Sequence, residues 1–509
     1  MADDLLSVKP DLTPPARVVG EDEDARLAEF GYDQKLDRSV GRIASFAIGF
    51  STISATTAVF TGFGSGFLNA GSPFIWTLFI AIPVFLLWTL IAADMAAKIP
   101  LAGYAYQWTS RLNSPSYGWF TGCAALVGWT SGMTSLAYVF AGYLGSVLDW
   151  DLTQSRQILI AIGVVIVCVL INAYGLRLAT LINNIGVGLE LVITLAVTAL
   201  VAIFAFLVHD DAQPLSSLFH GHTPDNGSYV LAWITAALGP FFGLVGVEAV
   251  ADVAEETKDA RRVIPRTMFY AFATSCVIEF LMYLVYVLAI RHPAAVGSSS
   301  EPIEAIISQQ LGSVASRIVV AVALTNILVC LLANVLVGTR LLFSLARDNM
   351  MPFSAVLRRV HPVRRTPSVA VLSLGGVSVL MLLSALVNEK AFNYLLGVAT
   401  LAFFTTYVLQ TFGLLVASHR GRIPEAEPGT FDLGRARTPL LVISLVVFLA
   451  VEVGLIFLPM FAGNGFVFAG ILALPLLWWL VVLRKRLRTD EAGPLYASDH
   501  NPSMVNQMA

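Results

Sequence analysis

Five carboxylic acids lie inside long apolar stretches of this sequence, and they are the side chains there best suited to bind a proton or a cation. They are Glu190, Glu248, Asp252, Glu279 and Glu452. A charged carboxylate at the centre of a bilayer costs roughly 2.5–3.5 kcal/mol on insertion scales, so acids at such positions are candidates for binding a proton or a cation. The alternative for each is a protonated, hydrogen-bonded structural role. For Asp252, at the end of its stretch, pairing with nearby basic residues is a further explanation.

The apolar stretches that hold these acids are predicted to be membrane-spanning helices. The chain has 509 residues, of which 57% are hydrophobic and 13% charged, and its mean hydropathy is +0.75. Soluble proteins average about 25% charged residues, so the composition indicates an integral membrane protein. Because one span needs roughly 20 apolar residues, we predict twelve spans. They lie near 43–70, 74–97, 117–148, 157–175, 179–207, 229–253, 267–290, 316–339, 368–387, 391–417, 439–461 and 465–483.

The basic residues predict how these spans are oriented. With the N-terminus in the cytoplasm, 27 of the 31 lysines and arginines fall in cytoplasmic stretches. This bias follows the positive-inside rule and places both termini in the cytoplasm. We expect one membrane domain at 35–485, with repeats at about 43–207 and 229–417 and extra helices at about 439–483. Residues 1–34 and 486–509 are polar, and we expect them to be disordered cytoplasmic tails.

Two of the predicted spans are interrupted by residues that break helices. The first, within 43–73, contains a serine and threonine cluster followed by Gly62, Gly64 and Gly66, and the sixth contains Gly239, Pro240, Gly243 and Gly246. Broken backbone in a bilayer is tolerated where it lines a protein cavity. Interruptions at corresponding positions of two five-helix halves are typical of inverted-repeat transporters. A packing kink is the alternative for either segment taken alone.

Several other classes of protein are disfavoured by missing motifs. The chain has no Gly-x-x-x-x-Gly-Lys-Ser/Thr phosphate loop and no His-Glu-x-x-His or Cys-x-x-Cys pair. The glycine-rich stretch at 61–67 sits in a membrane segment and follows no predicted strand, so it is not a dinucleotide loop. The four cysteines lack metal-ligand spacing and are expected to be buried thiols. We therefore expect no enzyme activity, no cofactor, no metal site and no nucleic-acid partner.

Several segments resemble one known family. They are LAEFGYDQKLDRSVGRIASFAIGFSTIS (27–54), IPLAGYAYQWTSRL (99–112), GVEAVADVAEETKDARRVIPR (246–266) and GTRLLFSLARDNMMP (338–352). Over about residues 27–485 the chain is similar to the amino acid/choline transporter branch of the amino acid–polyamine–organocation superfamily. The resemblance implies an all-α membrane protein of the LeuT type, with twelve transmembrane helices as two inverted five-helix repeats plus two C-terminal helices. It also implies a substrate site between unwound parts of helices one and six.

The resemblance carries over to particular positions of the two broken helices. Family members have Gly-Ser-Gly in helix one, where backbone N–H groups hold a substrate carboxylate, and that spacing falls on Thr56-Thr57-Ala58 here. Because both glycines are replaced here, side chains limit how closely a substrate carboxylate can approach the backbone. The substrate carboxylate is therefore not expected to be bound in the same way as in those family members. Phe242 matches the aromatic gate of helix six. The candidate substrate-binding residues are Ser54, Thr56, Thr57, Ala58, Phe242, Gly243 and Gly246.

The acids have candidate roles as well. Glu190 falls where several relatives have a lysine in helix five that is thought to stand in for a sodium ion. A carboxylate there reverses the charge, which suits a titrating proton carrier or the recognition of a cationic amine. Glu190 and Glu248 are therefore the candidates for proton coupling or cation recognition.

A charged block follows helix six and predicts a cytoplasmic gate. We expect Glu255 and Glu256 to lie near Arg261, Arg262 or Arg347 when this gate is closed. Partly exposed ion pairs are worth about 0–1 kcal/mol, so they can form and break during a transport cycle.

Together these observations predict a secondary active transporter that imports a small amine or amino acid across the plasma or inner membrane with a proton, surrounded by membrane lipids. An obligate exchanger is the first alternative. A transporter-like nutrient receptor is the second, although its short tails offer no signalling region. The sequence does not choose among amine and amino acid substrates.

Overall fold

The computed structural model describes residues 19–221, 228–299, 301–386, 391–457 and 463–495, and all regular structure in these ranges is helical. The one β-type contact among them is an isolated parallel bridge between Val40 and Thr257. It ties the segment before the first apolar helix to the segment after the sixth. The expectation of an all-α protein is confirmed for the described residues.

The longer helices in chain order are α1 (Val19–Glu29), α2 (Arg42–Ile53), α3 (Ala55–Ala70), α4 (Leu78–Lys98), α5 (Tyr104–Leu112), α6 (Pro115–Val147), α7 (Gln154–Tyr174), α8 (Leu176–Ile203), α9 (Tyr229–Gly243), α11 (Ala260–Leu288), α13 (Pro302–Leu311), α14 (Ser313–Arg347), α16 (Ser368–Ser384), α17 (Ala391–His419), α18 (Arg437–Phe457) and α19 (Asn464–Trp478). Short α-helices are α10 (Ala249–Asp252), α12 (Pro293–Ser298), α15 (Ser354–Leu357) and α20 (Arg484–Arg488). Single turns of 3₁₀- or π-helix are η1 (Ser72–Thr77), η2 (Phe204–Val208), η3 (Leu215–Phe219), η4 (Ala254–Glu256), η5 (Gly434–Ala436) and η7 (Trp479–Leu483).

Helices α2 to α20 belong to one compact unit, Leu36–Pro494, which is close to the predicted membrane domain. Helix α1 belongs to a separate unit and was not predicted, because its segment is polar and acid-rich. The start of the predicted C-terminal tail is also ordered, because α20 extends to Arg488 and the Gly493 N–H donates to the Asp348 carbonyl oxygen at 2.9 Å. Residues 1–18 and 496–509 of the predicted tails lie outside the described part of the chain.

Ten helical segments among the described residues are long and apolar enough to cross a membrane. Two further apolar helices, Tyr229–Phe241 and Ser368–Ser384, are shorter. Each of the twelve predicted spans therefore falls on an apolar helix, and the short ones are the sixth and ninth. The sixth is short because α9 stops at its glycine-rich break. The chain is thus a multi-pass membrane protein, while the total of twelve crossings and the orientation of the termini remain predictions.

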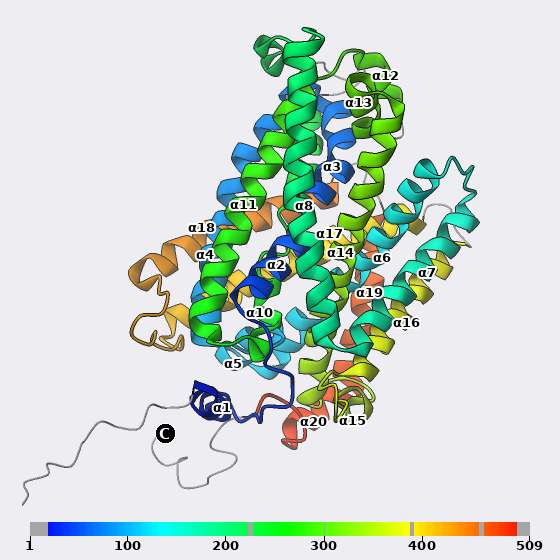
Figure 1. Cartoon of the computed structure of the whole chain (residues 1–509). Coiled ribbons are helices and arrows are strands. Elements are labelled where there is room, and N and C mark those ends of the chain that lie inside the picture. The colour runs from blue at the N-terminus through cyan, green and yellow to red at the C-terminus, as the bar shows by residue number, and fades with distance from the viewer. Residues whose placement is uncertain (1–18, 222–227, 300, 387–390, 458–462, 496–509) are drawn as a thin grey trace, which may run out of the picture. The chain divides into compact units, whose positions relative to one another are not determined.

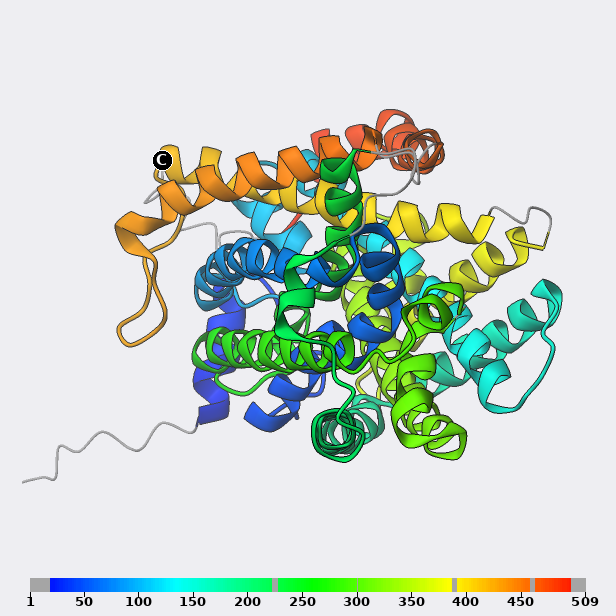
Figure 2. The same cartoon turned by 90° about the horizontal axis from the view of Figure 1, so that it is seen from above.

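The first span is the most deeply enclosed of the ten membrane-length helical segments. In its most apolar stretch 83% of residues are buried, against 22% for the span that contains α18 and 11% for the span that contains α19. Helix α2 packs against α8, α11 and α14, and α3 packs along α9. Figure 1 shows α8 passing the junction of α2 and α3, and Figure 2 shows α18 and α19 along one edge of the bundle. The broken segments are therefore inside, where other helices can satisfy their backbone.

Helices α3 and α9 approach each other through two glycines. A Cβ atom built on Gly239 would lie 2.7 Å from the carbonyl oxygen of Gly62, and one built on Gly62 would lie 2.9 Å from the Cα of Gly239. Small residues at such a crossing let two backbones come into direct contact, as in other membrane helix pairs.

Replacing Gly239 with alanine is expected to destabilise the protein, since the new methyl group would meet backbone that cannot move aside. We expect a loss of about 1–3 kcal/mol, seen as a lower melting temperature in detergent. Gly188→Ala on α8 is the matched control, because a Cβ there meets no atom within 4 Å and alanine favours a helix. A melting temperature for Gly239→Ala equal to that of Gly188→Ala would contradict the contact.

Candidate functional site

The first apolar span breaks at Ser54, which separates α2 from α3. Its backbone is left-handed, with φ 42° and ψ 87°, a conformation uncommon for residues other than glycine. The Ser54 hydroxyl accepts a hydrogen bond from the Thr57 N–H at 3.3 Å and lies 2.7 Å from the Thr57 hydroxyl. Ser54 is therefore the N-cap of α3, satisfying one of the N–H groups left free where a helix begins.

The carboxylate of Glu190 binds at this break. Its Oε1 accepts hydrogen bonds from the Ser54 hydroxyl at 3.0 Å and from the Thr56 N–H at 3.4 Å. The side chain comes from α8 and is fully buried, and its Oε2 has no hydrogen-bond partner among the described residues. A negative group is favoured at this position, because the N-terminal end of a helix carries partial positive charge. Glu190, a candidate for proton coupling or cation recognition, thus contacts the break in the first span.

The sixth span breaks between Gly243, where α9 ends, and Ala249, where α10 begins. Gly246 within the break has a φ of +100°, which side chains rarely adopt, and a Cβ there would lie 2.9 Å from Cγ2 of Thr52. Its N–H donates to the Tyr407 hydroxyl at 3.4 Å. Glycine is required at this position by both conformation and space.

The two breaks lie against each other, but they do not gather all the predicted substrate residues on one surface. A Cβ on Gly243 would lie 2.6 Å from the Cβ of Ala58, so these two positions face each other closely. Thr56 instead points to α8, with its hydroxyl 2.8 Å from that of Thr194. It borders a cavity of about 10 Å³, room for about one water molecule. The side chain of Phe242 lies outside the described part of the chain.

Ion pairs hold the segment after the sixth span in place. Glu255 pairs with Arg347 at 2.8 Å and also accepts the Ala102 N–H at 3.1 Å. Glu256 binds Arg340 in a two-pronged pair, with distances of 2.8 and 3.0 Å and both side chains buried. These contacts join η4 to α14 and to the loop before α5. They close this end of the helix bundle.

Arg347 is one of the three arginines predicted near Glu255 and Glu256, and the other two contact the loop between α17 and α18. Arg261 pairs with Glu427 in the loop between α17 and α18, and Arg262 lies beside Gly429 of the same loop, where a Cβ would be 3.6 Å from its Nη2. The first turn of α11, which begins at Ala260, thus brings both arginines to this loop.

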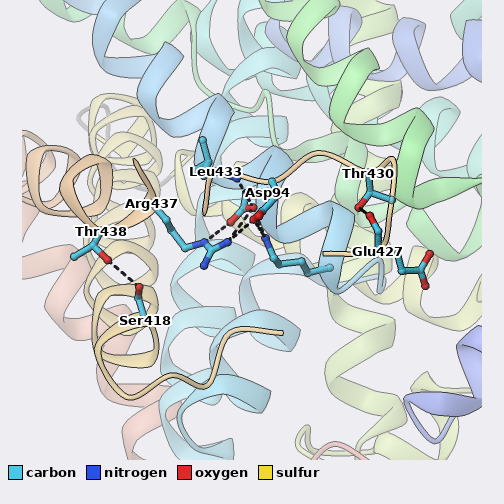
Figure 3. Close-up of polar contacts among 9 residues, drawn as sticks. Asp94, Ser418, Glu427, Thr430, Leu433, Arg437 and Thr438 are labelled. Atoms are coloured by element: carbon cyan, nitrogen blue, oxygen red, sulfur yellow. Dashed lines mark hydrogen bonds and ion pairs between the residues drawn. The ribbon is translucent and has the colours of Figure 1, made fainter. Parts of the chain in front are cut away.

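The same loop is bound to the end of α4 by a cluster of charges (Figure 3). Asp94 pairs with Lys98 and, at 2.6 Å, with Arg437. Asp432 lies 2.6 Å from both Lys98 and Arg437. The hydrogen bond from Lys98 lowers the pKa of Asp432 to about 2. Opposite charges from α4, the loop and α18 therefore meet in one network.

Comparison with known proteins decides what kind of molecule this arrangement belongs to. A family model described as amino acid permease matches residues 40–482. The chain belongs to the amino acid permease family. This places it in the amino acid–polyamine–organocation superfamily, as the sequence motifs predicted, and makes it a membrane transporter and not an enzyme.

The permease is similar to curated proteins from several kingdoms. It is 24% identical over 445 residues to the amino-acid permease BAT1 homolog of Oryza sativa subsp. japonica, covering 82% of this chain and 84% of that one. It is 25% identical over 355 residues to the branched-chain amino acid permease BcaP of Lactococcus lactis subsp. cremoris, covering 64% and 73%. It is 24% identical over 481 residues to the thiamine transporter thi9 of Schizosaccharomyces pombe, covering 84% and 79%.

Glu248 of the permease has a different environment from Glu190. Its carboxylate accepts hydrogen bonds from Trp88 Nε1 at 3.0 Å, from the Tyr104 hydroxyl at 3.2 Å and from the Tyr407 hydroxyl at 3.0 Å. These donors come from α4, α5 and α17. Both oxygens are in use, so the contacts favour a role in positioning the start of α10 over one in binding a ligand.

Arg340 is the most informative residue that the sequence analysis missed. It was counted among the basic residues that set topology, yet its side chain is fully buried against Glu256. A signal was present, because Arg340 is followed by the apolar run Leu341–Phe343 and so sits within a helix and not in a loop. Tyr407 gave no comparable signal, since one more tyrosine in an apolar helix is unremarkable.

The buried and exposed ion pairs should differ greatly in their effect on stability. Arg340→Ala leaves Glu256 as an unpaired buried charge and is expected to cost about 3–5 kcal/mol. Arg177→Ala breaks a pair with Asp37 in which the arginine is exposed, and should cost at most about 1 kcal/mol. Melting temperatures of both variants in detergent test this. Equal losses would contradict the assignment of the Arg340 pair as buried.

Asp432 should make stability depend on acid pH. Because its pKa is lowered from 3.8 to about 2, its favourable contribution is complete above about pH 4 and is lost as pH falls toward 2. Asp432 is half-exposed, so the contribution is at most about 1 kcal/mol. The difference in melting temperature between the wild-type protein and Asp432→Asn should shrink across this range. A constant difference would show that Asp432 does not titrate there.

Proposed function

We propose that the permease is a secondary active transporter that imports a small amine or amino acid across the plasma membrane together with a proton. Transport proceeds by alternating access around the two broken helices. In this proposal both termini are cytoplasmic, the chain crosses the membrane twelve times, and its two five-helix halves form inverted repeats. Membrane lipids surround the peripheral helices. The substrate meets the protein where α3 and α9 touch.

The observation that carries the coupling proposal is the contact between Glu190 and the start of α3. Ionised, the carboxylate receives charge-assisted hydrogen bonds from Ser54 and Thr56, which are roughly twice as strong as neutral ones. Protonation removes that charge and weakens the link between α8 and helix one. The unpartnered Oε2 is available to carry the proton. Proton binding at Glu190 would in this way weaken the contact between α8 and the start of α3, which has to rearrange when access alternates.

The ion pairs between η4 and α14 resist the opening of the site toward that end of the helix bundle. Glu255, Glu256 and Asp252 all bind groups across this end, the last by accepting the Gly103 N–H at 2.9 Å. When the site opens toward that side, these contacts have to break. The buried pair of Glu256 and Arg340 would set the largest part of that barrier, because separating a buried pair costs more than separating an exposed one.

The proton gradient supplies enough energy for uptake. One proton crossing about 100 mV yields roughly 2.3 kcal/mol. At about 1.4 kcal/mol per decade this supports roughly 40-fold accumulation of substrate. An obligate exchanger would instead need substrate on both sides and no titrating group.

Proteoliposome uptake of radiolabelled substrate, with an imposed inward proton gradient and no internal substrate, tests the function. We expect the wild-type protein to accumulate substrate and Glu190→Gln to lose accumulation while still exchanging internal for external substrate. Thr405→Val is a control that removes a hydrogen bond to the peripheral Glu452, and it should accumulate normally.

Three other results would change the account. Uptake by the wild-type protein that requires internal substrate would indicate an exchanger. Binding without any transport would indicate a receptor. Normal accumulation by Glu190→Gln at all pH values would make Glu190 a structural hydrogen-bonding residue.

A further inference from the structure

Glu279 is a buried acid to which none of the described residues donates a hydrogen bond. It lies on α11, its side chain is fully buried, and neither carboxylate oxygen has a hydrogen-bond partner. Ser275 and Tyr283, four residues before and after it, also have buried hydroxyls without a partner. Residues four apart share one face of a helix. One face of α11 thus presents three polar groups whose hydrogen-bonding capacity is unused.

This face of α11 is turned toward the two broken helices. A Cβ on Gly243 would lie 2.9 Å from Oε1 of Glu279, beside the Cβ of Ala58. A Cβ on Gly62 would lie 3.0 Å from the Tyr283 hydroxyl. Glu279 therefore sits where the last turn of α9 meets the first turn of α3, at the place that the proposed function gives to the substrate.

The electrostatic surroundings of Glu279 favour a cation. Helix α9 ends at Gly243, and the C-terminal end of a helix carries partial negative charge, which repels a carboxylate. Glu190 lies at a positive helix end and has two donors, and Glu248 has three donors. Glu279 has none among the described residues. A buried charge without a partner is very costly, so an ionised Glu279 would be stabilised by a group that supplies positive charge and N–H donors.

We propose that Glu279 binds the protonated amine of the transported substrate, with the hydroxyls of Tyr283 and Ser275 as additional polar partners. The inference rests on the proposed function and names the group that recognises the substrate's ammonium. The contact of Ala58 with Gly243 fills the adjoining space in this closed arrangement. The ammonium group enters when α3 and α9 separate. The two acids then have separate tasks, Glu190 carrying the proton and Glu279 the substrate amine.

The test begins with the full-length wild-type protein in detergent. Thermal-shift measurements with L-leucine, L-lysine, 4-aminobutyrate, ethanolamine and putrescine identify the compound that stabilises it most. The dissociation constant of that compound is then measured by calorimetry for the wild-type protein, Glu279→Gln and Glu452→Gln. Glu452 is a matched control, since it is also an acid within an apolar helix with one unpartnered oxygen, but it lies on peripheral α18. We expect at least tenfold weaker binding by Glu279→Gln and no more than a twofold change for Glu452→Gln.

A double-mutant cycle with the ligand separates direct recognition from a structural effect. The second ligand is the same compound with its amine replaced by a hydroxyl group. Direct binding predicts that this replacement weakens binding to the wild-type protein at least tenfold but scarcely affects Glu279→Gln, because the pair is already broken. Should Glu279→Gln fail to purify as a single species, Glu279→Asp serves in the same cycle, since it shortens the reach of the carboxylate.

Two results would overturn the inference while leaving transport intact. One is an unchanged dissociation constant for Glu279→Gln, and the other is a cycle in which both changes weaken binding independently. If none of the five compounds is bound or taken up by the wild-type protein, the proposed function fails and this inference fails with it.

Discussion

A helix that stops inside a membrane protein leaves N–H and C=O groups without partners, and this constraint governs the centre of the permease. At Ser54 the chain turns left-handed, and the freed N–H groups of α3 are bound by the Ser54 hydroxyl and by Glu190. An unsatisfied backbone group in hydrocarbon costs several kcal/mol. In this protein α8 supplies a carboxylate that binds one of these groups, and the first span is the most enclosed of the ten membrane-length helical segments.

The buried acids form a series in which the surroundings decide the role. Glu256 is neutralised by two hydrogen bonds from Arg340, and Glu248 is held by three neutral donors. Both carboxylates are held by these contacts and link neighbouring helices. Among the described residues, Glu190 has one oxygen bound and one without a partner, and Glu279 has both without. Asp252 and Glu452 also keep one oxygen without a partner. Glu279 therefore has the largest unused capacity, and Glu190 is set apart by its contact with the break in the first span.

Much of this arrangement follows from the sequence, and the parts that do not have physical reasons. Apolar length and glycine spacing locate the spans and both breaks, because backbone requirements are local. The pairing of Glu256 with Arg340 could not be derived, since it depends on how α14 is rotated against η4. Family resemblance singled out Glu190 as a candidate for proton coupling, and residue spacing alone would not have done so. Glu279 was recognised as a buried acid, yet its lack of donors could be seen only once its neighbours were placed.

The central claim is that a proton moves with the substrate through an interior built around two broken helices, with Glu190 as its carrier. It is tested most directly by recording internal pH with a trapped dye in proteoliposomes, without an imposed gradient, when external substrate is added. The account predicts that the wild-type permease acidifies the interior in proportion to substrate uptake and that Glu190→Gln does not. Substrate uptake by the wild-type permease with no change in internal pH would contradict it.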